Sequence, residues 1–168
     1  MKIYLVLVLS LVTSFVTFAE NTTENASVMF KVKMSQTCFH SSVSSLSSGK
    51  LDGWACDDND KNQKFLFIPT KNEWFQLKNV STGLCVEVKN ANKRHHVSTA
   101  LAVCNQQDHQ LWKKSPVKGD WFALSAKHSL RCLDLDHGVS RNGNRFIQHA
   151  CIAHDNKTWL DKQLFKVI

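Results

Sequence analysis

Several kinds of segment are missing from this 168-residue chain, and each absence narrows its class. No stretch after the first twenty residues keeps a helical period, so a helical bundle is not expected. Beyond the N-terminal segment, no apolar run approaches the roughly 20 residues of a membrane-spanning helix. Acidic residues number 14 against 21 basic ones, which excludes an acidic tail and leaves polyanions open as ligands.

Catalytic and metal-binding motifs are missing as well. The sequence has no nucleophile elbow, no His-Glu-x-x-His pair and no phosphate-binding glycine loop. It has no Cys-x-x-Cys, and its eight histidines do not fall at zinc-ligand spacings from the cysteines. A glycosidase needs two carboxylates across one cleft, which Asp134 and Asp136 on one expected strand do not supply. We therefore expect no enzyme, no metal and no cofactor.

The composition fits one globular domain. Hydrophobic residues make up 43% and charged residues 21% of the chain, a balance that can bury a core. The formal net charge is +7.

The first twenty residues have the organisation of a secretory signal peptide. Lys2 gives a short basic start, the run Ile3–Val12 is apolar, and Ala19 is small enough for a cleavage site. We expect residues 1–19 to be a signal peptide, residues 20–27 a short leader, and the protein to be secreted and extracellular. A membrane anchor is the alternative, but the apolar stretch covers only about 16 residues.

Sequons and cysteines agree with export. Four Asn-x-Ser/Thr sequons make N-glycosylation candidates of Asn21, Asn25, Asn79 and Asn156. In an oxidising compartment the six cysteines are expected to form disulfides rather than metal thiolates. The pair His95-His96 is interpreted as a solvated loop.

A threefold repeat of about 47 residues organises the chain after residue 27. Self-similarity at a fixed period indicates copies of one supersecondary unit. One set of cysteines, each 47 residues from the next, is Cys38, Cys85 and Cys132. A second set, with steps of 48 and 47, is Cys56, Cys104 and Cys151. Apolar residues that keep the 47-residue step are Phe30, Leu77 and Leu124, and Phe65, Trp112 and Trp159.

Each unit has the pattern of short strands. Segments such as Trp74–Leu77, Cys85–Val88 and Cys132–Leu135 alternate apolar with polar residues, and turn residues separate them. About four strands in each of three units predict an all-β fold, a β-trefoil over residues 28–168, because closure hides sheet edges. The Ser-rich stretch 41–49 is predicted to be a long loop.

The repeat also narrows the cysteine pairing. Six cysteines can pair in many ways, but threefold symmetry favours one disulfide in each unit. The favoured pairs are Cys38–Cys56, Cys85–Cys104 and Cys132–Cys151. Each would stabilise the domain by about 3 kcal/mol in the chain-entropy picture.

The unit resembles the repeat of ricin B-type lectins. That repeat reads Cys-x-Asp, then aromatic-x-Cys, then Asn-Gln-x-Trp. The Gln-x-Trp signature is Gln63-Lys64-Phe65, Gln110-Leu111-Trp112 and, in degenerate form, Lys157-Thr158-Trp159. The resemblance covers residues 28–168, and the cysteine-rich domain of mannose receptors is similar too. It implies that the signature residues Gln63, Phe65, Gln110, Trp112 and Trp159 are structural and that the aromatic residues pack in the core.

The resemblance also implies a sugar site in each unit. A carboxylate accepts hydrogen bonds from neighbouring hydroxyls, a flat ring stacks on the apolar sugar face, and an amide donates and accepts. In the third unit these roles fall on Asp134, His149 and Asn156. Asp134 could instead solvate a strand, His149 could be an ordinary surface histidine, and a glycan on Asn156 would cover the site.

The other two units are less complete. In the first unit Trp54 and Asn62 fit the aromatic and amide positions, but His40 replaces the carboxylate. Trp54 could also simply pack on the neighbouring disulfide. In the second unit Glu87 is a candidate, yet Ala102 offers no ring. We therefore rank the third site first, the first site second, and expect the second to be inactive.

The leading functional hypothesis is a secreted, non-catalytic carbohydrate-binding protein. Its expected partners are glycans or glycoproteins of galactose/GalNAc type or sulfated glycans, with no nucleic acid. The alternative is a basic trefoil that binds sulfated polysaccharide, or a cytokine-like or toxin-subunit module without a working hexose site. Basic residues in 89–96 and 113–118 keep that alternative open.

Overall fold

The structure is a computed structural model that describes residues 26–152 and 161–168. Those residues contain twelve strands, as the sequence pattern predicts, and five short 3-10 turns. The strands are β1 (Phe30–Val32), β2 (Cys38–Ser45), β3 (Ser48–Trp54), β4 (Phe65–Pro69), β5 (Phe75–Asn79), β6 (Cys85–Val88), β7 (Val97–Ala102), β8 (Trp112–Lys118), β9 (Trp121–Ala126), β10 (Cys132–Leu135), β11 (Asn144–His149) and β12 (Phe165–Val167). The 3-10 turns are η1 (Lys61–Gln63), η2 (Lys89–Ala91), η3 (Asp108–Gln110), η4 (Asp136–Gly138) and η5 (Asp161–Gln163).

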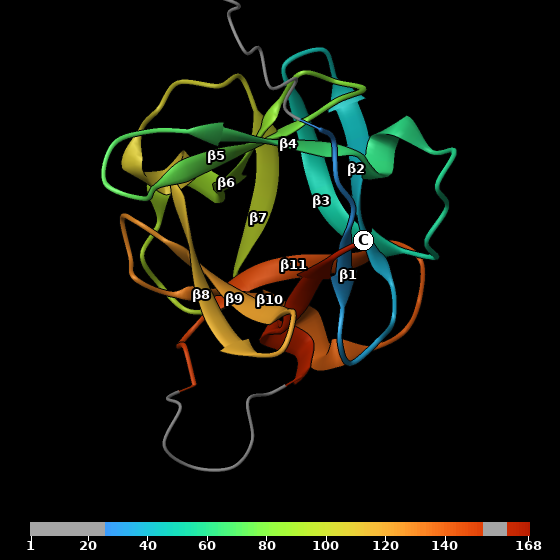
Figure 1. The fold of residues 1–168 in the computed structure, drawn as a ribbon. Coiled ribbons are helices and arrows are strands. Elements are labelled where there is room, and N and C mark those ends of the chain that lie inside the picture. The colour runs from blue at the N-terminus through green and yellow to red at the C-terminus, as the bar shows by residue number, and fades with distance from the viewer. Residues whose placement is uncertain (1–25, 153–160) are drawn as a thin grey trace, which may run out of the picture.

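Half of the strands close into a barrel (Figure 1). Antiparallel pairing runs from β1 to β12, then to β9, β8, β5 and β4. A bridge between Val28 and Phe65 brings β4 back beside β1 and completes the ring. Closure leaves this part of the sheet without a free edge.

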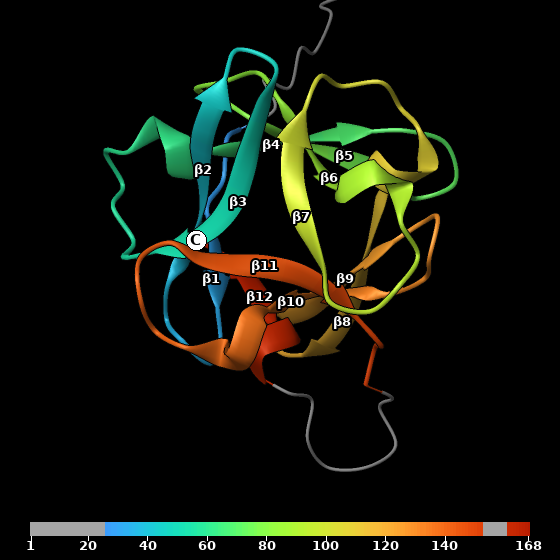
Figure 2. The same ribbon diagram turned by 180° about the vertical axis from the view of Figure 1, so that it is seen from behind.

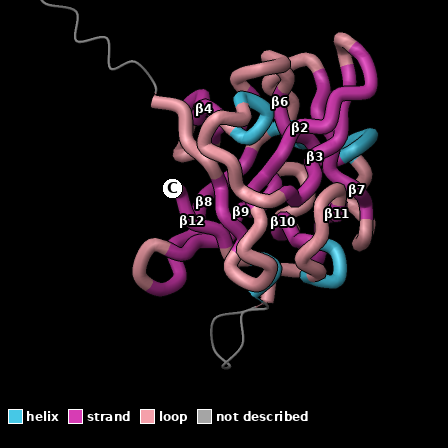
Figure 3. Tube along the Cα trace, turned by 90° about the vertical axis from the view of Figure 1, so that its right-hand side faces the viewer, coloured by secondary structure: helices cyan, strands magenta, loops and turns pink. Residues whose placement is uncertain are grey.

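The other six strands form three hairpins that cap the barrel (Figure 2). The hairpins are β2–β3, β6–β7 and β10–β11. Their second strands pair with one another in a triangle, β3 with β7, β7 with β11 and β11 with β3. A barrel capped by three hairpins is the β-trefoil arrangement. Strands dominate the trace, and helical turns occur only as short links between them (Figure 3).

The core lies inside the barrel and under the cap. Phe30, Leu77 and Leu124, one from each unit, are fully buried. The ring centroids of Phe39 and Phe165 lie 5.0 Å apart in an edge-to-face contact. Burial of such large rings supplies most of the hydrophobic free energy of a domain this small.

The third Gln-x-aromatic element lies six residues further along the chain than predicted. η5 ends at Gln163 and β12 begins with the fully buried Phe165, so Phe165 takes the core position expected of Trp159. Gln110 follows Gln63 by 47 residues, but Gln163 follows Gln110 by 53. The assignment of Trp159 to this position is therefore wrong, because an insertion after the last cysteine breaks the period. Trp159 itself lies outside the described residues.

The three glutamines have the same structural task. Each Nε2 donates to the carbonyl of the residue before the second cysteine of its unit. These bonds are Gln63 to Ala55 at 2.8 Å, Gln110 to Val103 at 3.0 Å and Gln163 to Ala150 at 3.0 Å. This hydrogen bond from a buried amide holds the segment that leads from each hairpin back to the barrel.

Three disulfides connect Cys38 to Cys56, Cys85 to Cys104 and Cys132 to Cys151. Each joins the first residue of a hairpin to the segment just after the same hairpin. The described residues contain no free cysteine.

The Ser-rich stretch is not a loop, which corrects the expectation for residues 41–49. It belongs to β2 and β3, which pair from Cys38 with Trp54 to Ser45 with Ser48. Gly49 permits this pairing, because a Cβ there would lie 3.0 Å from the carbonyl oxygen of Ser42. Composition suggested flexibility, whereas backbone pairing decides the structure.

Asn79 is not available as a glycan acceptor in this fold, which contradicts the sequon-based expectation. It is 0% exposed, and its Nδ2 donates to the carbonyls of Asn62 and Lys64 at 2.9 and 3.1 Å. Its Oδ1 accepts from the amide and hydroxyl of Thr82. A glycan would need the nitrogen that these contacts occupy.

The predicted signal peptide, with the sequons Asn21 and Asn25, and the sequon Asn156 lie outside the described residues. Among the residues that are described, no helix is long and apolar enough to cross a membrane.

Candidate functional site

The fold brings three equivalent sets of side chains to the outer face of the cap. The position two residues after the first cysteine holds His40, Glu87 or Asp134. The position two before the second cysteine holds Trp54, Ala102 or His149. The position just before the buried glutamine holds Asn62, His109 or Lys162. The last set differs from the sequence-based alignment, which placed Asn156 where the structure has Lys162.

The third unit does not present its carboxylate to solvent. Asp134 is 0% exposed, and its Oδ2 accepts from Gln163 Nε2 at 2.8 Å. The Nζ atom of Lys162 lies 3.3 Å from the other carboxylate oxygen. In this arrangement the Asp134 charge is balanced inside the protein, and the residue acts in the link between β10 and η5.

The ring expected to be a platform in the third unit is also in contact with protein. His149 is half-buried, and the rings of His95 and His96 lie 5.1 and 4.8 Å from its ring. The adjacent Gln148 holds this loop, since its Nε2 donates to the carbonyls of Asn92 and Arg94, both at 2.6 Å. His95 and His96 are exposed and lie in a loop, as expected, and their rings also contact His149 of the third unit.

The second unit resembles the third in its side-chain contacts. Glu87 Oε2 lies 3.3 Å from His109 Nε2 and accepts from Gln110 Nε2 at 3.1 Å. Ala102 provides no ring.

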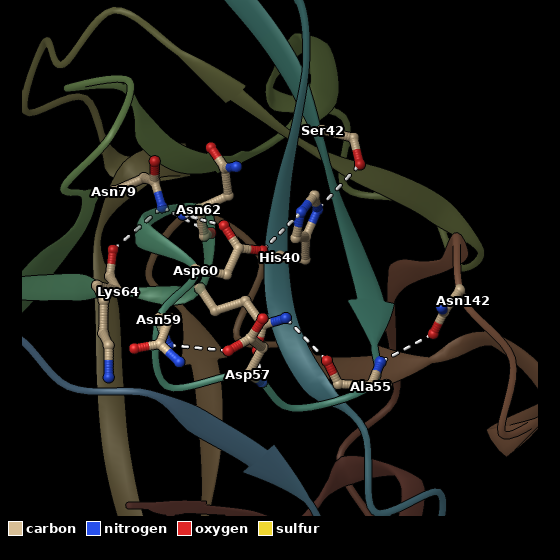
Figure 4. A network of polar contacts seen from close by, with 11 residues as sticks. His40, Ser42, Ala55, Asp57, Asn59, Asp60, Asn62, Lys64, Asn79 and Asn142 are labelled. Atoms are coloured by element: carbon tan, nitrogen blue, oxygen red, sulfur yellow. Dashed lines mark hydrogen bonds and ion pairs between the residues drawn. The ribbon is translucent and has the colours of Figure 1, made fainter.

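The first unit gathers a different set of side chains on its surface (Figure 4). His40 and Trp54 lie next to each other across β2 and β3, with ring centroids 4.8 Å apart and an interplanar angle of 31°. His40 Nε2 lies 3.3 Å from Asp60 Oδ2, and its Nδ1 lies 3.2 Å from the Ser42 hydroxyl. Trp54 is half-buried, as His149 is, and part of its side chain can be contacted from solvent.

Asp60 and Asn62 reach this surface because of the local turn. Asp60 is the N-cap of η1, and its Oδ1 accepts from the Asn62 amide at 2.9 Å. The side-chain amide of Asn62 has no hydrogen-bond partner among the described residues and remains half-exposed. The surface therefore offers one aromatic ring, one carboxylate, one imidazole and one free amide.

The electrostatics of the first unit depend on a second carboxyl group. Burial lowers the pKa of His40, although the negative charges of Asp60 and Asp52 act to raise it. Burial raises the pKa of Asp52, against the hydrogen bond from Ser42 and the positive charges of Lys50 and His40. Sequence reasoning missed Asp52 and Asp60. The alternation of Lys50, Asp52 and Trp54 along one strand was the available signal for Asp52.

The three units share one feature that the sequence analysis did not identify. In each unit an acidic and a basic side chain lie beside each other, one from the hairpin and the other from the 3-10 turn. In the second and third units the acid, Glu87 or Asp134, is on the hairpin and the base is on the turn. In the first unit the order is reversed, with His40 on β2 and Asp60 at the turn.

A metal site does not emerge from these residues. Within 26–152 and 161–168, no group of three or more His, Cys, Asp or Glu side chains could hold an ion. The site thus consists of protein side chains suited to hydrogen bonding and stacking.

The barrel, the three hairpins and the three surface sets together define a β-trefoil domain of the lectin type. The sequence matches the family described as ricin-type beta-trefoil lectin domain-like over residues 15–95 and 61–149. The chain belongs to this family. No curated protein matches it in sequence.

Solved structures agree on the fold. The designed threefold-symmetric protein ThreeFoil is 16% identical, with a TM-score of 0.76 over 84% of this chain and 97% of that one. A ricin B-like lectin of Macrolepiota procera, solved with lactose, is 14% identical, with a TM-score of 0.67 over 85% and 94%. An exo-β-1,3-galactanase of Clostridium thermocellum is 16% identical, with a TM-score of 0.77 over 87% of this chain but only 30% of the enzyme.

Proposed function

We propose that this protein is a secreted, non-catalytic lectin whose neutral-sugar site lies on the first unit. The observation that carries the proposal is the contact set of Trp54, His40, Asp60 and Asn62 on one half-exposed surface. The lactose complex of the Macrolepiota lectin, a protein of the same fold, supports a β-galactoside as the ligand class.

Each side chain has a role in this proposal. The half-exposed indole of Trp54 stacks on the apolar face of a pyranose. Asp60 accepts from sugar hydroxyls in charge-assisted hydrogen bonds, with His40 fixing its orientation. The free amide of Asn62 both donates and accepts, which can discriminate between epimers. Asp60 thus replaces the carboxylate that His40 displaces from β2.

The first unit takes precedence over the third for a physical reason. Asp134 has no exposed surface and faces Lys162 and Gln163, so it cannot accept from a ligand without losing those partners. A buried carboxylate that loses its partners costs several kcal/mol. One weak sugar contact does not compensate for such a cost.

The ligand is proposed to be of galactose/GalNAc type or a sulfated glycan on a glycoprotein. Secretion is part of the proposal and is supported by the N-terminal signal pattern and by the disulfides, which persist in oxidising compartments. Glycosylation is proposed only for Asn21, Asn25 and Asn156.

The test is lactose binding to the purified mature protein, measured by titration calorimetry or NMR. We expect a dissociation constant on the order of millimolar, as for one shallow site. Trp54→Ala and Asn62→Ala should each reduce affinity at least about tenfold, since stacking and a paired amide are lost. Trp74→Ala, which changes a half-buried tryptophan on the barrel, is the matched control and should leave affinity unchanged.

The proposal fails if Trp54→Ala binds lactose as well as the unchanged protein does. It also fails if only His149→Ala abolishes binding, because the third unit would then hold the site.

A further inference from the structure

A cleft on the cap lies beside the proposed sugar site rather than within it. It has a volume of about 710 Å³ and is formed by residues of all three units. Strands β3, β7 and β11 frame this face of the cap (Figure 2). The turns η2 and η4 contribute the remaining walls.

The cleft has no large aromatic ring in its lining, although the imidazole of His137 lies at it. The small side chains of Ala100 and Ala102 lie opposite β3, and that of Ser98 lies opposite β11, which leaves the hollow open. No Phe, Tyr or Trp lines it, so a sugar ring has no platform there. Recognition in this cleft must rest on charge and hydrogen bonds.

The acids of the cleft already have partners or are shielded. Asp136 Oδ2 accepts from Arg145 Nε at 2.8 Å. Glu87 is held by His109 and Gln110, as described above. Asp52 is 5% exposed and accepts from Ser42.

Three cations of the cleft have no such partner. Lys50, Lys89 and Arg141 are exposed, and none forms an ion pair within residues 26–152 and 161–168. They come from β3, η2 and the segment after η4, so one cation stands in each unit. Four Lys and Arg side chains line the cleft against three carboxylates, which gives a formal charge of +1. The cations, Arg145 included, are the exposed members of this set, so the cleft presents positive charge to an anion.

The position of the cleft indicates which anion. Lys50 and Trp54 lie on the same face of β3, four residues and therefore about 13 Å apart. A short oligosaccharide that stacks one sugar on Trp54 can reach Lys50 with a residue further along its chain. A ligand that joins a stacking ring to a nearby anion is a glycan with an anionic substituent.

We propose that this cleft binds the sulfate or carboxylate group of an anionic glycan, through Lys50, Lys89 and Arg141. The inference rests on the proposed lectin function and extends it, since the glycan would contact the protein at two places, the Trp54 surface and the cleft. The Arg fork suits a planar carboxylate or a sulfate, and the two lysines add point charges.

The experiment compares a sulfated galactan oligosaccharide with the same oligosaccharide without sulfate. Calorimetry at physiological salt would be used, because exposed charges act less at high salt. The cleft variant is Lys50→Gln/Lys89→Gln/Arg141→Gln. Its control, with the same charge change on the barrel side, is Lys31→Gln/Lys71→Gln/Lys118→Gln. These control lysines also lack ion pairs within the described residues.

The cleft variant should lose at least about tenfold in affinity for the sulfated probe, because three charge-assisted contacts disappear. The control should lose no more than about twofold, since diffuse attraction is screened. The desulfated probe should bind both variants equally. A uronic acid oligosaccharide, tested in parallel, shows whether carboxylate replaces sulfate, and loss of binding to either probe supports the proposal.

Equal losses in the two variants would overturn it, because the basic surface as a whole would then be responsible. Binding of a DNA duplex that depends on the cleft residues as strongly as glycan binding does would also overturn it. Lactose binding by the unchanged protein separates the two proposals. If the unchanged protein binds no lactose but the cleft variant still loses the sulfated probe, only the first-unit site fails. If lactose binds and sulfate adds nothing, only the cleft proposal fails.

Discussion

At the scale of single residues, Lys162 decides the state of the third unit. In the second and third units the residue just before the buried glutamine lies beside the hairpin residue two after the first cysteine. In the first unit that position holds the uncharged Asn62, but in the third it holds a cation 3.3 Å from Asp134. The carboxylate can be fully buried because this cation and Gln163 replace its water.

This role predicts the effect of Lys162→Met. The change leaves the Asp134 carboxylate buried with only Gln163, so we expect the unfolding free energy to fall by about 3 kcal/mol. Chemical denaturation at neutral pH would measure it. Lys166→Met, at a cation that only stacks on Trp121, is the control and should cost less than about 1 kcal/mol.

The double variant Asp134→Asn/Lys162→Met should recover most of the loss, because no unpaired charge remains buried. If Lys162→Met alone is as stable as the control, the ion pair contributes nothing and Asp134 must be balanced elsewhere.

At the scale of elements, the loop from Asn92 to His96 contacts the third unit. These contacts include two histidines, His95 and His128, that are more easily kept neutral in the folded loop. Partial removal from water, then the charges of Arg131, His149 and His96, lower the pKa of His95. Burial lowers the pKa of His128, despite its hydrogen bond to the Asn92 carbonyl. Lys93 and Arg94 add positive charge to the same loop.

The sign of the pH effect follows from these directions. Groups whose pKa is lower in the folded loop than the ordinary value near 6.5 bind fewer protons when the loop is closed. The contact is therefore at full strength above that value and weakens as the pH falls below it. We expect the His96 amide, which donates to the Gln148 carbonyl, to exchange faster at about pH 5.5 than at about pH 7.5, once intrinsic rates are corrected.

Amides of the β8–β9 hairpin, such as that of Leu124, provide the internal reference and should show no such change. Replacing His95 and His128 by Gln should remove most of the pH dependence. Equal protection of His96 at both pH values would contradict this account.

Elements also show where sequence reasoning succeeds and where it stops. The 47-residue period predicts twelve strands. The spacing of Cys85, Cys104 and Trp112 in the second unit recurs in other units of the same chain, which reflects one repeated backbone path. The same period misplaces the third signature, since an insertion shifts Gln163 without changing its contacts. Burial of Asp134 and Asn79 could not be predicted, because it depends on partners distant in sequence.

At the scale of the whole molecule, threefold symmetry is preserved in the core and lost on the cap surface. The barrel requires equivalent residues such as Phe30, Leu77 and Leu124 in each unit, because each fills a third of one closed interior. The outer face of each hairpin has no such requirement. The surface residues there differ between the units. In the first unit the side-chain amide of Asn62 has no partner among the described residues, whereas the second and third units each place an acid beside a base.

This divergence predicts the number of neutral-sugar sites. The second unit lacks a ring at Ala102 and the third has its carboxylate buried. Among residues 26–152 and 161–168, only the first unit then combines a ring for stacking with groups that hydrogen-bond a hexose. We expect lactose to saturate the protein at about one molecule per chain, with no gain in avidity for clustered lactose unless chains associate. NMR titration would show this as shifts confined to His40, Trp54, Asn62 and their neighbours.

The Trp54→Ala variant should then show no second, weaker set of shifts at any lactose concentration up to roughly tenfold above the dissociation constant. Shifts at Glu87 or His149 that saturate independently of those at Trp54 would contradict a single site. In that case the acid–base pairs of the second and third units would have to open for the ligand, and Lys162→Asn should strengthen the third-unit signal. Because that substitution removes the cation and introduces a hydrogen-bonding amide, as Asn62 provides in the first unit, it separates a closed third site from one that merely binds weakly.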